Sequence, residues 1–122
     1  MRADFVIEST TIGLDRVEHA LGRPPDKSIA IGDAIARSNR KYDRNIFRYR
    51  LSNGMRSDEV IDQIKDLIFG DNVKWSEIKE SHKYLDITIE SGSIIGDFCM
   101  SVEIVERMRV IDVQIQFDIP RY

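Results

Sequence analysis

The chain has 122 residues, the length of a single domain spanning 1–122, and folding at this size buries enough surface for a core without disulfides. Its residues are 42% hydrophobic and 32% charged, as in soluble globular proteins, and no apolar run approaches the roughly 18 residues of a membrane span. With a net charge of −3, one cysteine and no secretory signal, the chain is predicted to be cytoplasmic and free of internal disulfides.

The first third of the chain predicts a strand, a helix and a second strand. Residues 3–8 alternate in polarity, as a half-buried strand does. A helix is expected between Gly13, a candidate N-cap, and Gly22, which ends it just before Arg-Pro-Pro. Residues 27–31 form the next expected strand, and the polar stretch 33–45 is expected to be a loop with little structure of its own.

The middle of the chain predicts a strand followed by the clearest helix. Residues 45–51 alternate, with aromatic and aliphatic side chains on one side and Arg48 and Arg50 on the other. Residues 57–69 place their aliphatic side chains within one arc of a helix and their acidic side chains on the remainder. A further helical turn or two is expected over residues 73–80.

The last third predicts three strands and a short helix. Residues 84–90 alternate in polarity, and residues 94–100 form another expected strand. Ser101 is a candidate N-cap for a helix over 102–108. The closing strand is expected over 110–119, where apolar side chains alternate strictly with Asp and Gln.

The order of these elements indicates an α+β fold. We expect one mostly antiparallel sheet, helices packed on one face, and split β-α-β connections. Helices then cover only the apolar face, so the polar side chains of the strands share an uncovered face with an acidic majority. This set comprises Asp112, Gln114, Gln116, Asp118, Asp86, Thr88, Glu90, Arg48 and Arg50. The alternative is a sheet face that simply meets water, which is common in antiparallel proteins.

The two arginines of the uncovered face have two possible sets of partners. Arg48 and Arg50 are expected to pair either with acids of a binding partner or with Asp86 and Glu90 of the same sheet. The sequence leaves this choice open.

No motif for catalysis, metal binding or cofactor binding is present in the sequence. His19 is expected on an exposed helix side, His82 in a charged loop, and Cys99 inside an apolar strand, where cysteine acts as a small hydrophobe. The chain has no HxxxH, CxxC or EF-hand spacing and no glycine-rich phosphate loop. We therefore expect no catalytic residues, no metal and no cofactor.

Two charged segments are candidates for partner contacts. Asp58, Asp62 and Asp66 repeat every four residues on one helix side. The mutual repulsion that the helix tolerates there suits the attraction of a basic partner, whereas an ordinary solvated surface is the favoured interpretation of this feature taken alone. Residues 37–50 are rich in arginine and contain aromatic side chains, a mixture that suits nucleic acid. The acidic second half and a pI near 5.4 make nucleic acid the less favoured partner.

Several stretches of the chain resemble a family of small bacterial domains of unknown function. The similarity covers LDRVEHALGRPPDKSIAIGD, where a helix ending in Leu-Gly precedes a proline and a strand ending in Gly-Asp. It continues through NIFRYRL, VIDQIKDLI and the strand-helix-strand ending DFCMSVEIVERMRVIDVQIQFDI. The family usually carries a tryptophan in the aromatic strand, where this chain has Phe47 and Tyr49.

The resemblance implies a function in toxin neutralisation, because relatives are found among immunity proteins encoded beside polymorphic or contact-dependent toxins. We therefore hypothesise an immunity protein that binds a cognate basic toxin domain, a nuclease effector of such a system, in the cytoplasm. No membrane is involved. The residues expected to contact the toxin are Asp58, Asp62, Asp66, Asp112, Gln114 and Asp118. The alternative is a non-enzymatic interaction or regulatory domain that forms a homodimer through its sheet.

Overall fold

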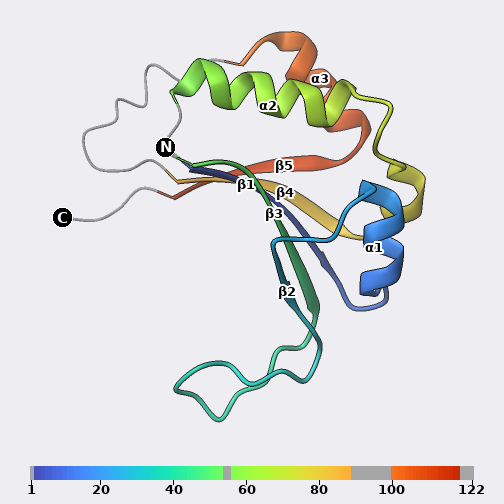
Figure 1. The fold of residues 1–122 in the computed structure, drawn as a ribbon, viewed down its shortest axis with the longest axis vertical. Helices are drawn as coiled ribbons and strands as arrows, with labels where there is room; N and C mark the ends of the chain where they lie inside the picture. The colour runs from blue at the N-terminus through green and yellow to red at the C-terminus, as the bar shows by residue number, and fades with distance from the viewer. Residues whose placement is uncertain (1, 54–55, 89–99, 119–122) are drawn as a thin grey trace, which may run out of the picture.

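The computed structural model describes residues 2–53, 56–88 and 100–118, which form one sheet and a layer of helices (Figure 1). Among these residues, no helix is both long and apolar enough to cross a membrane. In chain order the elements are β1 (Arg2–Ser9), α1 (Leu14–Leu21), β2 (Lys27–Ile29), β3 (Asn45–Asn53), α2 (Ser57–Phe69), the 3-10 helix η1 (Trp75–Ile78), β4 (His82–Thr88), α3 (Val102–Val110) and β5 (Val113–Asp118).

The five strands lie in the order β2-β3-β1-β4-β5. The central strand β1 pairs antiparallel with β3 and β4, β2 pairs antiparallel with β3, and β4 and β5 pair in parallel. It follows that β1-α1-β2 and β3-α2-β4 each join two parallel strands with a third strand between them, which is the split β-α-β arrangement. The predicted α+β class and the mostly antiparallel sheet are confirmed.

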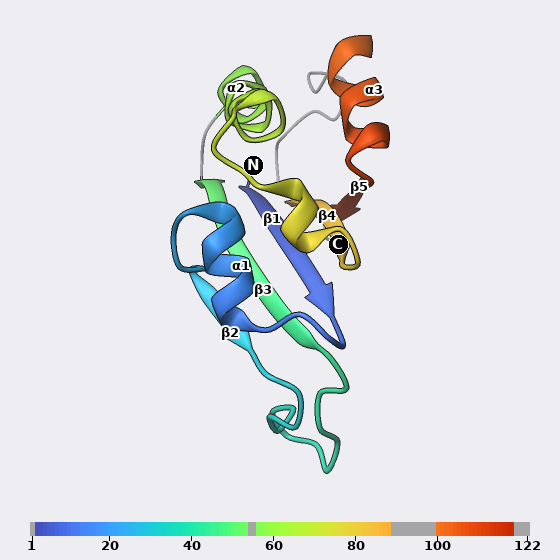
Figure 2. The same ribbon diagram turned by 90° about the vertical axis from the view of Figure 1, so that its right-hand side faces the viewer.

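The helices cover one face of the sheet (Figures 1 and 2). On this face Phe5 of β1 and Leu85 of β4 are fully buried, and Ile64 of α2 and Ile104 of α3 pack into the same core. Trp75 of η1 adds an edge-to-face contact with Phe5, with ring centroids 5.8 Å apart. The core therefore lies between the sheet and the helices.

The helix ends follow from local sequence in the way predicted. Gly22 adopts φ 76° after α1 and donates its N–H to the Glu18 carbonyl at 2.8 Å. Helix α2 has the predicted bounds, and Gly70 closes it by donating to the Asp66 carbonyl at 3.1 Å. Ser101 caps α3, because its hydroxyl accepts the N–H of Ile104 at 3.4 Å.

The segment of residues 30–44, here called the arm, contains no helix and no named strand, as predicted for a loop, but an isolated β-bridge between Ala34 and Lys41 gives it some internal structure. β2 ends at Ile29 rather than Ile31, and the arm projects past the ends of β2 and β3, away from the helices (Figure 1). Its two sides are joined by backbone hydrogen bonds from Gly32 to Tyr42 at 2.9 Å and from Ile35 to Arg40 at 3.0 Å. These non-local bonds leave no signature in the polar composition of the segment.

One side chain joins the base of the arm to the turn that precedes α1. The Asn45 carbonyl oxygen Oδ1 accepts the N–H of Ile31 at 2.9 Å, and its Nδ2 donates to the carbonyl of Ile12 at 3.0 Å. Asn45 therefore connects the arm, β3 and the turn that precedes α1.

The C-terminal strand begins later than predicted. Helix α3 continues to Val110, and Asp112 adopts φ 57° in a tight turn, so β5 starts at Val113 instead of Val110. The predicted strand 94–100 lies, apart from Met100, outside the described residues.

Candidate functional site

The uncovered face of the sheet is organised around Arg48. Its Nη1 atom donates to Asp4 Oδ2 at 2.8 Å and to Asp86 Oδ2 at 2.9 Å. The three residues come from β3, β1 and β4, which are neighbours in the sheet, so antiparallel register brings them side by side. Of the two sets of partners left open by the sequence, the pairing of Arg48 with Asp86 within the sheet is therefore confirmed, whereas Glu90 lies outside the described residues.

Asp4 is the member of this network that sequence reasoning missed. Its side chain is only 2% exposed, and its second oxygen, Oδ1, accepts Arg50 Nε at 3.0 Å. The sequence did contain a signal for the position of Asp4: side chains alternate along a strand, so Asp4, next to the inward-facing Phe5, is expected on the polar side of β1. The partners of Asp4 are decided by the pairing register between β1 and β3. This register shifts between Ala3 and Asp4, where β3 has one extra residue, Leu51.

The two carboxylates hold Arg48 in its charged form. Burial alone lowers the pKa of Arg48, but hydrogen bonds from Arg48 to Asp4 and Asp86, and the charges of these two carboxylates, raise the pKa above its ordinary value. A guanidinium fixed between two carboxylates is a rigid charged group. The centre of the face is therefore pre-organised.

The carboxyl groups of Asp86 and Asp118 are neighbours beside this centre. The pKa of the exposed Asp118 is raised, first because a protonated Asp118 can donate a hydrogen bond to Asp86, then by desolvation and by the negative charge of Asp86. Asp86 is 7% exposed, and its Oδ1 is buried with no hydrogen-bond partner in the part of the chain that the structure describes. A proton on Asp118 would satisfy that oxygen, since two ionised carboxylates have no donor to share.

Val6 and Tyr84 show that the face has its own small buried patch. Val6 is fully buried although it points away from the helices, because Arg48 and Tyr84 flank it on the two neighbouring strands. Burial raises the pKa of Tyr84 to about 12. The face is therefore packed enough to hold a fixed shape without a helix above it.

The predicted acidic majority is not found on the described part of this face. In the described strands it carries four cations and four anions, which are Arg2, Lys27, Arg48 and Arg50 against Asp4, Glu8, Asp86 and Asp118. The cations Lys27, Arg48 and Arg50 lie on β2 and β3, whereas Asp86 and Asp118 lie on β4 and β5. The face is polarised from a basic side to an acidic side.

The structure places the six predicted contact residues in three separate locations. Gln114 and Asp118 are exposed on β5 and point away from the helices, as predicted. Asp58, Asp62 and Asp66 are exposed on α2, in the helical layer on the opposite side of the sheet. One flat partner surface cannot contact both groups.

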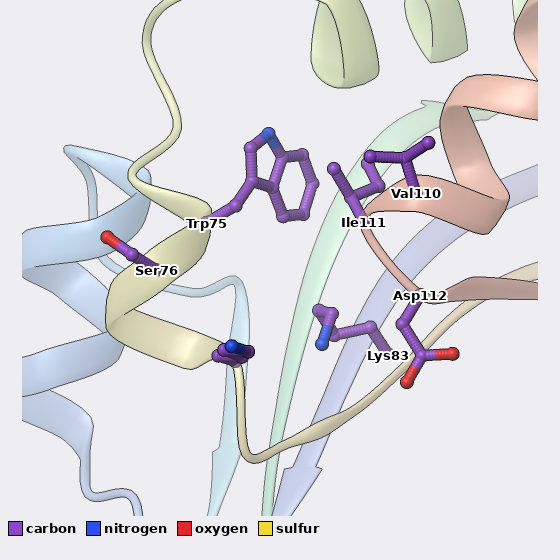
Figure 3. A pocket seen from close by; sticks show the side chains of 7 residues that line it. Trp75, Ser76, Lys83, Val110, Ile111 and Asp112 are labelled. Atoms are coloured by element: carbon purple, nitrogen blue, oxygen red, sulfur yellow. The ribbon is translucent and has the colours of Figure 1, made fainter.

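Asp112 occupies the third location, and its predicted place on the uncovered face is wrong. Because α3 runs on into the turn, Asp112 precedes β5 and lines a cavity on the helix side with Lys83 and Trp75 (Figure 3). Polar and apolar residues continue to alternate before the start of β5, so the sequence pattern alone could not reveal this turn. Lys83, an almost fully buried lysine on β4, was not singled out by the sequence either.

The histidines lie on the surface as predicted, and the basic segment is partly on the arm. His19 is exposed on α1, 3.9 Å from a Glu77 carboxylate oxygen, and His82 is exposed at the start of β4. Arg37 and Arg40 are exposed on the arm, whereas Arg48 is committed to the sheet network. Cys99 lies outside the described residues.

The fold and the site together define a single-sheet α+β domain whose uncovered face carries a fixed charge network. The chain belongs to the family described as "Domain of unknown function (DUF4279)", whose model matches residues 1–122. This confirms the expected family of unknown function. No similar curated protein and no similar solved structure was found.

Proposed function

We propose that this chain is an immunity protein that binds a cognate toxin and neutralises it in the cytoplasm of the producing cell. The toxin would be a basic protein, a nuclease effector of a contact-dependent or polymorphic toxin system. The observation that carries the proposal is an unsatisfied acceptor on the uncovered face: the buried Asp86 Oδ1 has no hydrogen-bond donor among the described residues, and the exposed Asp118 lies beside it. An acceptor of this kind favours a cationic donor from a partner.

The rigidity of the face supports binding. Arg48 fixes Asp4 and Asp86, so these carboxylates lose little conformational freedom when a partner arrives. Gln114 and Gln116 are exposed beside them on β5 and offer both donors and acceptors.

A lysine or arginine of the toxin would take the place of the proton between Asp86 and Asp118. The position between Asp86 and Asp118 belongs to the acidic side of the face. It is separate from the three exposed aspartates of α2, Asp58, Asp62 and Asp66. Because α2 lies on the opposite side of the sheet, its carboxylates act on the approach of a basic toxin rather than in the contact.

Co-expression with the toxin domain encoded by the neighbouring reading frame tests this proposal. Asp118→Lys places an internal cation beside Asp86, so we expect it to abolish growth protection and to weaken binding at least about tenfold. Glu103→Lys, at an exposed acidic position of α3, is the matched control and should protect like the original chain. Full protection by Asp118→Lys would exclude the proposed contact.

Self-association through the sheet is the second candidate, and the polarised face favours it. Two copies related by a two-fold axis would bring the basic β2-β3 side of one against the acidic β4-β5 side of the other. Light scattering over a range of protein concentrations at low salt distinguishes the two candidates. A constant monomer mass excludes the homodimer, and a dimer that dissociates with salt supports it.

A further inference from the structure

A cavity separate from the sheet face lies between η1 and the turn that joins α3 to β5 (Figure 3). Its volume is about 280 Å³, close to the lower limit of about 300 Å³ for small-molecule sites. Trp75 forms one wall, Val110 and Ile111 face it from the other side, and Lys83 lies below them (Figure 3). The cavity is therefore an apolar slot with a cation at its base.

Lys83 is a buried cation that has no ion pair among the described residues. It is 2% exposed, and its Nζ donates to the carbonyls of Ser81 at 3.1 Å and Ile78 at 3.3 Å. An ammonium has three N–H donors, so one is left for another acceptor. Burial lowers the pKa of Lys83, while the negative charge of Asp112 acts in the opposite direction. Burying a charge in this way is costly unless a counterion is present.

The charges around the cavity select the ligand. Lys79 and Lys83 contribute two positive charges and Asp112 one negative charge, which leaves one positive charge to be neutralised. The rest of the lining is mainly the indole of Trp75 and the aliphatic side chains of Val110 and Ile111. A single carboxylate on a compact apolar body matches both properties.

The backbone beside the cavity is unusual as well. Asp112 adopts φ 57°, a left-handed conformation that is uncommon for residues other than glycine, and such positions concentrate at binding sites. In Figure 3 its carboxylate is turned away from Trp75. The space beside Trp75 is therefore free of the Asp112 carboxylate and can hold the apolar part of a ligand.

We propose that this cavity binds a small monocarboxylate, with the carboxylate on Lys83 and the apolar body between Trp75 and the Val110–Ile111 wall. Such binding needs no toxin and is independent of the function proposed above. The bound carboxylate supplies the counterion that Lys83 lacks and links η1 to the turn before β5.

Fluorescence of Trp75, the single tryptophan of the chain, gives a direct test. We expect cyclohexanecarboxylate to produce a saturable change and the uncharged cyclohexanecarboxamide to bind about tenfold more weakly. Affinity for the carboxylate should fall as pH rises and Lys83 loses its proton. No saturable change with millimolar carboxylate, or equal binding of acid and amide, would overturn the proposal.

Variants separate ligand binding from a purely structural role of Lys83. Lys83→Met should abolish binding, with Lys74→Met as the control, since Lys74 is exposed and does not line the cavity. Because Lys83→Met removes two internal hydrogen bonds, Asp112→Asn is the decisive variant. It removes the negative charge at the rim, so carboxylate affinity should rise severalfold. Unchanged or weaker binding by Asp112→Asn would contradict the proposed charge balance.

Discussion

At the scale of single residues, Arg48 is the group on which the uncovered face depends. Its side chain is 27% exposed and bonds two carboxylates, whereas the side chain of Arg50 is 43% exposed and, among the described residues, bonds one carboxylate, that of Asp4. Arg48→Met would leave Asp86 buried without its cation, so we expect a loss of about 3 kcal/mol in the free energy of unfolding. Arg50→Met is the matched control and should cost below about 1 kcal/mol. Urea denaturation measures both, and equal costs would contradict the central role of Arg48.

Asp118 gives the face a defined pH dependence. Its folded-state pKa is raised by Asp86, so the folded chain binds more protons than the unfolded chain. The resulting stabilisation is fully present below the ordinary aspartate pKa of about 4 and is lost as pH rises through the raised value. Asp118→Asn donates to Asp86 without carrying charge, so we expect it to be the more stable protein at neutral pH.

The difference between the two denaturation curves isolates this effect. Urea midpoints of the original chain and of Asp118→Asn are measured at a series of pH values, and contributions of the other acids largely cancel in the subtraction. The advantage of the variant should increase with pH across the titration of Asp118. Two parallel curves would show that Asp86 and Asp118 do not share a proton.

At the scale of elements, the end of α2 depends on the absence of a side chain. At Gly70 an added Cβ would lie 2.5 Å from the Asp66 carbonyl oxygen, although φ at Gly70 is an ordinary −70°. We expect Gly70→Ala to cost about 1–3 kcal/mol by forcing the helix end apart. Gly13→Ser is the control, because nothing lies within 4 Å and serine is a good N-cap. Thermal denaturation of the two variants measures both changes in stability: we expect Gly70→Ala to lower the melting temperature and Gly13→Ser to leave it unchanged or raise it.

The elements also show what could be predicted from the sequence. The helix between Gly13 and Gly22 and the helix over 57–69 were predicted correctly, because caps and helical periodicity are local signals. Asp112 was misplaced because two backbone bonds, from Ile111 to Arg107 and from Asp112 to Arg109, continue the helical turn where polarity already alternates. The strand pattern cannot show where a preceding helix stops.

Contacts between distant segments were the part that could not be predicted. The network of Asp4 with Arg48 and Asp86 requires the register of three strands, including a shift at Leu51. The arm requires bonds across its own turn and the side chain of Asn45. The uncovered position of Gln114 and Asp118 was predictable, since it needs only the alternation within β5 and helices on one side.

At the scale of the whole molecule, acidic groups occupy two opposite surfaces, and this arrangement predicts different kinetic effects. Reversing charge at Asp62 and Asp66 on α2 changes the long-range field without touching the proposed contact. Reversing charge at Asp118 changes the contact itself. We therefore expect Asp62→Lys with Asp66→Lys to lower mainly the association rate, and Asp118→Lys to raise mainly the dissociation rate.

Surface plasmon resonance with the toxin domain of the neighbouring reading frame measures both rates. Because surface charges are screened over about 8 Å at physiological ionic strength, added salt should reduce the association rate of the original chain. The double α2 variant should respond less to salt, since part of its attraction has been removed. If instead the α2 variant dissociates faster while Asp118→Lys behaves like the original chain, the toxin contacts the helical layer. The uncovered sheet face would then lose its proposed role, whereas carboxylate binding at Lys83 would be unaffected.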